Sequence, residues 1–85
     1  MIGSNLLIIE VAETSVAYDR DEKVPRYAQS GIREAWLIDI AQGVVEQYTH
    51  PLGDHYGARQ TLKRGEVVRA TTVPDLALPI DQILG

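Results

Sequence analysis

The sequence predicts an α/β (α+β) fold, built as one domain over residues 1–85 around a mixed β-sheet. An unbroken apolar run at residues 6–9 indicates a strand that is buried on both faces. A segment with helical spacing follows, and two apolar segments separated by a short turn then indicate a hairpin. The first strand, the helix and the second strand leave room for a parallel crossover, whereas the rest of the chain favours antiparallel pairing.

The first strand is expected over residues 5–12 and the main helix after it. Proline clashes with the carbonyl four residues earlier, so Pro25 belongs in the first turn of that helix. The helix should then begin near Asp19 or Asp21, either of which can cap it. Gly31 suits the left-handed position at which a helix ends.

The remaining elements follow from apolar runs and turn residues. Residues 33–40 and 44–50 are expected as the two hairpin strands around the turn at 41–43, and 51–57 as a loop. We expect weaker strands at 58–63 and 66–71, on either side of a turn at Arg64 and Gly65, and a short C-terminal helix at 78–84.

Composition narrows the classes of protein. The chain has 85 residues, 45% of them hydrophobic and 24% charged, and no cysteine, which excludes disulfides, thiolate nucleophiles and cysteine-based zinc sites. No segment has the features of a signal peptide or the length of a membrane span, so we expect a cytoplasmic protein with no membrane partner.

Charge argues against nucleic-acid binding by bulk attraction, because the net charge is −4. Residues 58–70 are nevertheless locally basic, with Arg59, Lys63, Arg64 and Arg69 against a single acidic residue, Glu66. This pattern is typical of a basic binding face and also of a solvated strand edge.

Glu10 is the first candidate for chemistry, because it directly follows the apolar run. A buried carboxylate must be neutralised, paired or bound to a cation. Glu10 either pairs with Lys or Arg for structural reasons or serves as a metal ligand or general base. Ligands bind beyond the carboxyl ends of parallel strands, where Glu10 lies, and Lys23 in the next helix can reach back toward it. A lysine beside a carboxylate and a metal can stabilise charge on a phosphate.

Other polar and aromatic residues are better explained by structure. Asp39 precedes a turn and is expected to cap it. Tyr27 and Trp36 are expected in the core. His50 and His55 have no zinc-site spacing and are expected to face solvent. No serine-hydrolase, glycine-rich phosphate-binding or Walker motif is present in the sequence.

Taken in order, five segments resemble the Uma-two family of bacterial endonucleases, within the restriction-endonuclease-like superfamily of PD-(D/E)xK nucleases. The resemblance extends from about Leu6 to Leu84, and it is the ordered set that is specific. Its segments are LLIIEVAETS, YDRDEKVPRYAQSGI, REAWLIDI, GVVEQY and LALPIDQIL.

The resemblance implies a restriction-endonuclease-like mixed sheet and Mg²⁺-dependent hydrolysis of DNA phosphodiester bonds. Glu10 matches the acidic residue of the superfamily's third motif and would be both a catalytic residue and the metal ligand. The lysine of that motif usually follows two residues later, where this chain has Ala12. Lys23 occupies the place that this family uses instead.

The resemblance also implies an upstream strand that carries the metal-binding aspartate of the superfamily's second motif. Only five residues precede Leu6 here, and Ser4 and Asn5 are poor Mg²⁺ ligands. We therefore expect the C-terminal portion of a nuclease domain. The alternative to an active endonuclease is an inactive structural or oligomerising module. Without upstream strands, residues 6–9 would be exposed, which predicts a homodimer or larger homo-oligomer.

Overall fold

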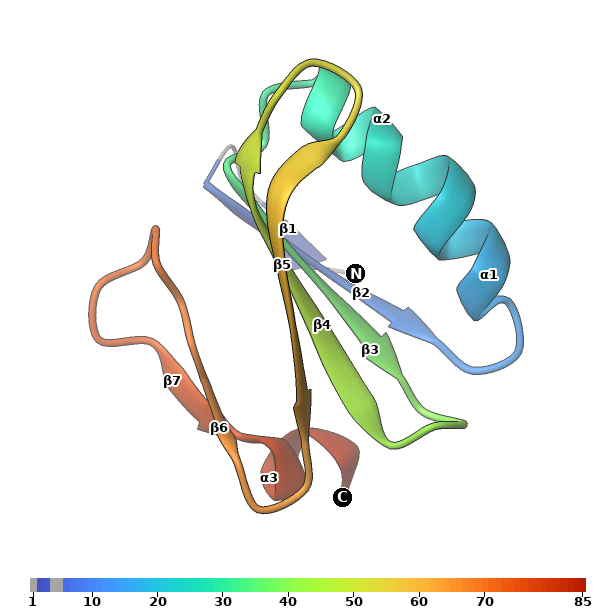
Figure 1. Ribbon diagram of the computed structural model, residues 1–85. Helices are drawn as coiled ribbons and strands as arrows, with labels where there is room; N and C mark the ends of the chain where they lie inside the picture. The colour runs from blue at the N-terminus through green and yellow to red at the C-terminus, as the bar shows by residue number, and fades with distance from the viewer. Residues whose placement is uncertain (1, 4–5) are drawn as a thin grey trace.

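The computed structural model describes residues 2–3 and 6–85 and confirms a mixed α/β arrangement (Figure 1). A five-stranded sheet has a helix on one side and a smaller two-stranded sheet on the other. The main sheet contains β1 (Ile2–Gly3), β2 (Leu7–Ala12), β3 (Glu34–Asp39), β4 (Val44–Pro51) and β5 (Tyr56–Lys63). The remaining elements are α1 (Val16–Tyr18), the π-helical turn η1 (Asp19–Lys23), α2 (Val24–Gln29), β6 (Val67–Arg69), β7 (Ala77–Pro79) and α3 (Ile80–Leu84).

The strands of the main sheet lie side by side in chain order, β1 to β5. Only β2 and β3 run parallel, joined by the helical crossover, and the other neighbours are antiparallel. The register aligns Glu10 with Leu37 and Leu37 with Glu46. Because directly opposed residues share a face of a sheet, these side chains form one row on the helix side.

The crossover helix begins earlier than expected. It starts at Val16, so neither Asp19 nor Asp21 caps it and Pro25 lies well inside. The expectation that Pro25 marks the first turn is wrong, because the π turn directly before it widens the helix. The Val24 N–H bonds to the Asp19 carbonyl, five residues back. Such a turn loosens the hydrogen-bond ladder where proline has no N–H to donate.

The helix ends as expected at Gly31, which has a φ of +75°. The turn after β3 also forms as expected, closed by a 2.9 Å bond from the Gly43 N–H to the Asp39 carbonyl. After β5 the chain turns at Gly65 and leaves the main sheet. There β6 pairs antiparallel with β7, and α3 closes the chain.

Hydrophobic residues pack on both faces of the main sheet. The cluster beneath the helix contains Ile8, Ala12, Val24, Ala35, Leu37 and Tyr48. The cluster between the two sheets contains Leu7, Trp36, Ile38, Val45, Leu62, Val68 and Ile80. Each face of the sheet is therefore covered by another element, as a layered fold requires.

The expected exposure of the first apolar run is mostly wrong. Leu7 and Ile8 are buried because β6, β7 and the helix cover the two faces of β2. Of that run, Leu6 does remain exposed, at 42%, and Ile9 is half-buried, while Val11 further along β2 is 49% exposed. Within the described residues, no helix has the length and apolar character needed to cross a membrane.

Candidate active site

Glu10 lies on the helix side of β2 and is held by two side chains from the crossover helix. Tyr27 donates its hydroxyl hydrogen to Oε2 at 2.7 Å, and Lys23 Nζ donates to Oε1 at 3.2 Å. The Glu10 side chain remains 12% exposed. A carboxylate has about four lone-pair positions, so each oxygen can accept a further contact.

Lys23 lies between two carboxylates. Its Nζ is 3.2 Å from Glu10 Oε1 and 3.4 Å from Asp19 Oδ1. The Lys23 side chain is 37% exposed, whereas that of Asp19 is 4% exposed. The π turn contributes to this arrangement, because it directs Asp19 and Val24, five residues apart, toward the sheet together. The Lys23 ammonium is thus fixed beside Glu10 and still reachable from solvent.

The electrostatics keep Glu10 ionised. Burial alone would raise the pKa of Glu10, but the hydrogen bonds from Tyr27 and Lys23 outweigh it and hold the pKa below its ordinary value. The bonds to Glu10 and Asp19 raise the pKa of Lys23. Burial and the bond to Glu10 raise the pKa of Tyr27. At neutral pH the Glu10 side chain is therefore an anion held by the Lys23 ammonium and the neutral Tyr27 hydroxyl.

A second polar network adjoins the first on the same face of the sheet. Arg20 forms a two-pronged ion pair with Glu46, and the Tyr48 hydroxyl donates to the same carboxylate. These bonds outweigh burial and lower the pKa of Glu46, while burial and its bond to Glu46 raise the pKa of Tyr48 to about 12. Sequence reasoning missed this network. The feature of the sequence that could have indicated it is Glu46, the one glutamate in the largely apolar segment 44–48.

A third carboxylate, Glu34, lies on the opposite face and has no exposed surface. Trp36 Nε1 and Gln47 Nε2 each donate to its Oε2 at 2.7 Å. The backbone N–H and hydroxyl groups of Thr71 and Thr72 donate to Oε1. Burial would raise the pKa of Glu34, but these bonds outweigh it and lower the pKa. Sequence reasoning did not single out Glu34, which lies at the start of an apolar strand.

The other residues singled out from the sequence lie at a turn, in the core or on the surface. Asp39 is buried and accepts a 3.0 Å bond from the Gln42 N–H, which confirms its turn-capping role. Trp36 is buried in the core, as expected. Tyr27 packs against the helix-side cluster and also reaches Glu10, so its role exceeds the expected one. His50 and His55 are exposed, as expected.

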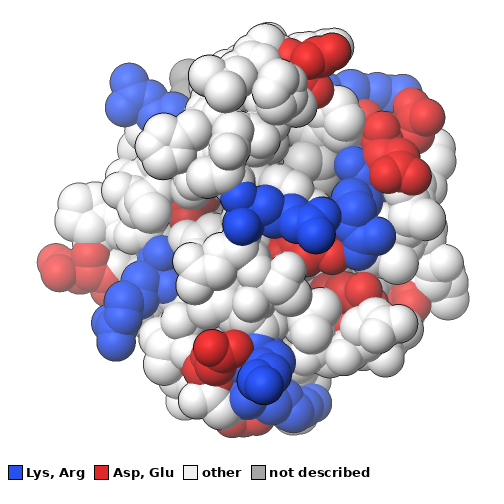
Figure 2. All heavy atoms as spheres, viewed as in Figure 1, with Lys and Arg blue, Asp and Glu red and all other residues white. Residues whose placement is uncertain are grey.

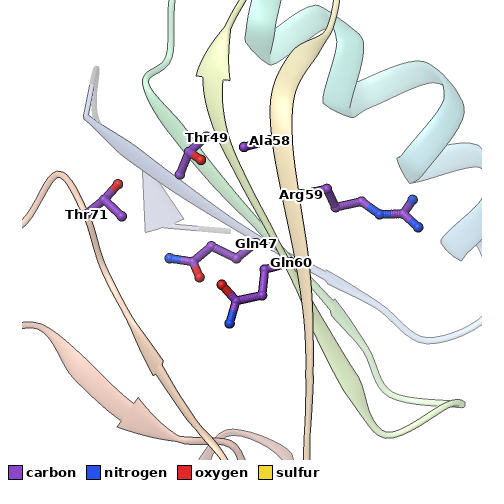
Figure 3. Close-up of a pocket in the computed structure, with 6 residues that line it drawn as sticks. All are labelled: Gln47, Thr49, Ala58, Arg59, Gln60 and Thr71. Atoms are coloured by element: carbon purple, nitrogen blue, oxygen red, sulfur yellow. The ribbon is translucent and has the colours of Figure 1, made fainter.

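The basic stretch does not form one continuous face. Arg64 pairs with Asp81, and Arg69 is on β6 in the smaller sheet. Arg59 and Lys63 are on β5, each exposed. Figure 3 shows the Arg59 side chain extending toward the helix, away from the other labelled residues.

Two hollows open on the side of the sheet away from the helix. A smaller one of about 150 Å³ is lined in part by Gln47, Gln60 and Thr71 (Figure 3). A larger one of about 430 Å³ is lined in part by Arg33 and His50. Neither is lined by Glu10 or Lys23, so the carboxylate–lysine pair lies apart from them.

The donor set fits a divalent cation only as a site with few protein ligands. The described residues contain no cluster of three or more His, Cys, Asp or Glu side chains that could hold a metal. Glu10 can supply one ligand, and Mg²⁺ is commonly held by one or two carboxylates together with water and phosphate oxygens. The remaining coordination would come from water and substrate.

One of three comparisons with known proteins finds a match. No curated protein and no solved structure matches the chain. A family model does match, over residues 4–81, and its description is "Putative restriction endonuclease". Restriction-endonuclease-like families generally use divalent metals and act on DNA, in keeping with a carboxylate of the mixed sheet held beside a lysine of the crossover helix. This match covers most of the sequence, and the chain belongs to the Uma2 family.

Proposed function

We propose that the chain is a Mg²⁺-dependent DNA endonuclease domain in which Glu10 and Lys23 act on the scissile phosphodiester. The observation that carries the proposal is the 3.2 Å pair between Lys23 Nζ and Glu10 Oε1 on the helix side of β2. In the superfamily's third motif the lysine usually follows the acidic residue by two positions on the same strand. Here the lysine comes instead from the helix after the strand, and the fold brings it beside the carboxylate. The family match supplies the reaction class.

Glu10 would hold the metal, and Lys23 would stabilise negative charge that develops on the phosphate. A divalent cation bound there would polarise the phosphate and lower the pKa of the attacking water. Tyr27 fixes the orientation of Glu10 by donating to Oε2. Asp19 also holds the ammonium of Lys23, and its bond helps to raise the pKa of that lysine.

Plasmid cleavage in Mg²⁺ or Mn²⁺ tests these roles. Glu10→Ala and Lys23→Ala should each lower the cleavage rate by about 100-fold or more, as the loss of one transition-state contact does. Glu22→Ala and Arg26→Ala are matched controls, because both side chains lie on the same helix and are largely exposed, at 54% and 65%. Equal rates in wild type and in both site variants would remove the assigned roles.

A catalytically inactive module is the second candidate. It is favoured by the engagement of both Glu10 oxygens within the protein and by the absence of a three-ligand cluster among residues 2–3 and 6–85. This candidate predicts no metal-dependent cleavage and no specific Mn²⁺ binding by calorimetry. Mn²⁺ binding that disappears in Glu10→Ala would exclude it.

We also propose that the chain forms a homo-oligomer through the outer side of β2. The short strand β1 pairs with β2 at Ile8 and Ile9. Leu6 and Val11, on either side of that pairing, are exposed and apolar. Exposed apolar side chains along one strand favour association with another chain. Sedimentation should show a dimer or larger species, and a stable monomer at high protein concentration would contradict this.

A further inference from the structure

The edge strand β5 carries two cations on the helix side of the sheet, Arg59 and Lys63. Both lie on one face of the strand with Thr61 between them, because alternate residues of a strand share a face. We call these three residues the β5 stripe. At ~3.3 Å per residue, Arg59 and Lys63 are ~13 Å apart. No strand follows β5 in the sheet order, so nothing in the described fold pairs with its outer edge.

The cations of the β5 stripe differ from the other cations on this side of the molecule. Arg20 and Lys23 are committed to buried or half-buried carboxylates. Arg59 and Lys63 form no ion pair among the described residues and are exposed. Arg59 does lie close enough to Glu46 and Tyr48 to affect their pKa values. Because the Arg59 and Lys63 side chains are both exposed, a partner in solvent can still reach their charges.

The arrangement also places these charges at the candidate site's flank. Thr61 is opposite Glu46 in the register, and Glu46 belongs to the same row as Glu10. Three strand spacings of ~4.8 Å separate Glu10 from Thr61, about 14 Å in all. Figure 2 shows Lys and Arg side chains gathered near the middle of the viewed face, with Asp and Glu atoms beside them.

We infer that the β5 stripe is a DNA backbone contact that binds phosphates flanking the one at Glu10. This inference rests on the proposed function and assigns the docking surface of the same site. The strand of the two cations lies three strand spacings, about 14 Å, from that of Glu10, so the cations contact phosphates beside the reacting one. They position the duplex without reading its sequence, as phosphate contacts do.

Binding of a fluorescent DNA duplex to the full chain, measured in EDTA over a series of salt concentrations, tests the inference. Arg59→Ala and Lys63→Ala should each weaken binding by roughly 5-fold and lower the slope of log K against log salt by about 0.9. Arg69→Ala is the matched control, since it removes an exposed arginine from the smaller sheet. It should change the affinity less than 2-fold.

The outcomes separate the β5 stripe from the catalytic proposal, because binding in EDTA does not require cleavage. An equal loss of duplex affinity in Arg59→Ala, Lys63→Ala and Arg69→Ala would show a general charge effect and overturn the inference. A wild-type chain that binds no duplex would also overturn it. Full cleavage by Glu10→Ala alongside weakened binding by Arg59→Ala would instead overturn the catalytic roles and keep the β5 stripe. Thermal melts confirm that each variant is folded.

Discussion

Glu10 and Glu34 are two carboxylates on opposite faces of one sheet, and their surroundings differ. Glu34 has no exposed surface and accepts bonds only from neutral donors. Glu10 faces solvent in part and has a lysine beside it. The pKa of each is lowered because hydrogen bonds outweigh burial. A perturbed pKa alone therefore does not mark a functional carboxylate. The accessible carboxylate, with a partly exposed lysine as its partner, is the candidate for chemistry.

The largest expected effect is on folding, at Glu34. Glu34→Gln replaces an acceptor-only group with an amide whose NH₂ opposes surrounding donors. Buried donors left unpaired cost about 1–3 kcal/mol each, so the free energy of unfolding should fall by about 3 kcal/mol or more. Urea denaturation measures this, with Glu22→Gln as the exposed control. A loss below about 1 kcal/mol would show that the Glu34 network does not connect the two sheets energetically.

The next effect compares the two cations of the π turn. Arg20→Met leaves the 6%-exposed Glu46 with Tyr48 as its remaining hydrogen-bond donor. The free energy of unfolding should fall by about 1–2 kcal/mol, moderated by the exposure of Arg20 itself. Lys23→Met should shift the urea midpoint by less, since Lys23 donates one bond to the 12%-exposed Glu10, whereas Arg20 donates two to Glu46. The reverse order of midpoints would mean that the Glu10 pair is the structural one.

Acid should destabilise the protein through all three buried or half-buried glutamates. Their pKa values in the folded state lie below the ordinary 4.5. The stabilisation is therefore complete above about pH 4.5 and is lost as the pH falls through the folded values. Urea midpoints measured across this range should drop on the acid side. If the urea midpoint of Glu10→Gln falls less on the acid side than that of wild type, part of the effect comes from Glu10. A wild-type urea midpoint that does not change with pH would contradict the account.

The elements that local pattern determines were predictable from the sequence. The β2 run, the turn at Gly43 and the stop at Gly31 each depend on neighbouring residues. The helix start was not predictable, because the rule for Pro25 assumes an α-helix and the π turn relaxes it. The pairing of β6 with β7 depends on contacts between distant segments, which periodicity does not encode.

Some residues of the candidate site could likewise be predicted from the sequence, and others could not. Glu10 and Lys23 could be predicted from a charge at a strand end and a helix that returns over it. Glu34 could not, because its donors Thr71 and Thr72 come from 37 and 38 residues further along the chain. At the sequence level it has the same pattern as any polar residue at the start of a strand. Only its partners distinguish a closed structural carboxylate from an accessible one.

The cleavage rate of Glu10→Gln in Mg²⁺, measured beside its melting temperature, tests the central claim most directly. The substitution keeps the side-chain shape but removes the charge that a metal and Lys23 require. The account predicts a loss of about 100-fold or more in cleavage by a variant that is less stable than wild type but still melts cooperatively. Cleavage at the wild-type rate by a folded Glu10→Gln variant would contradict it.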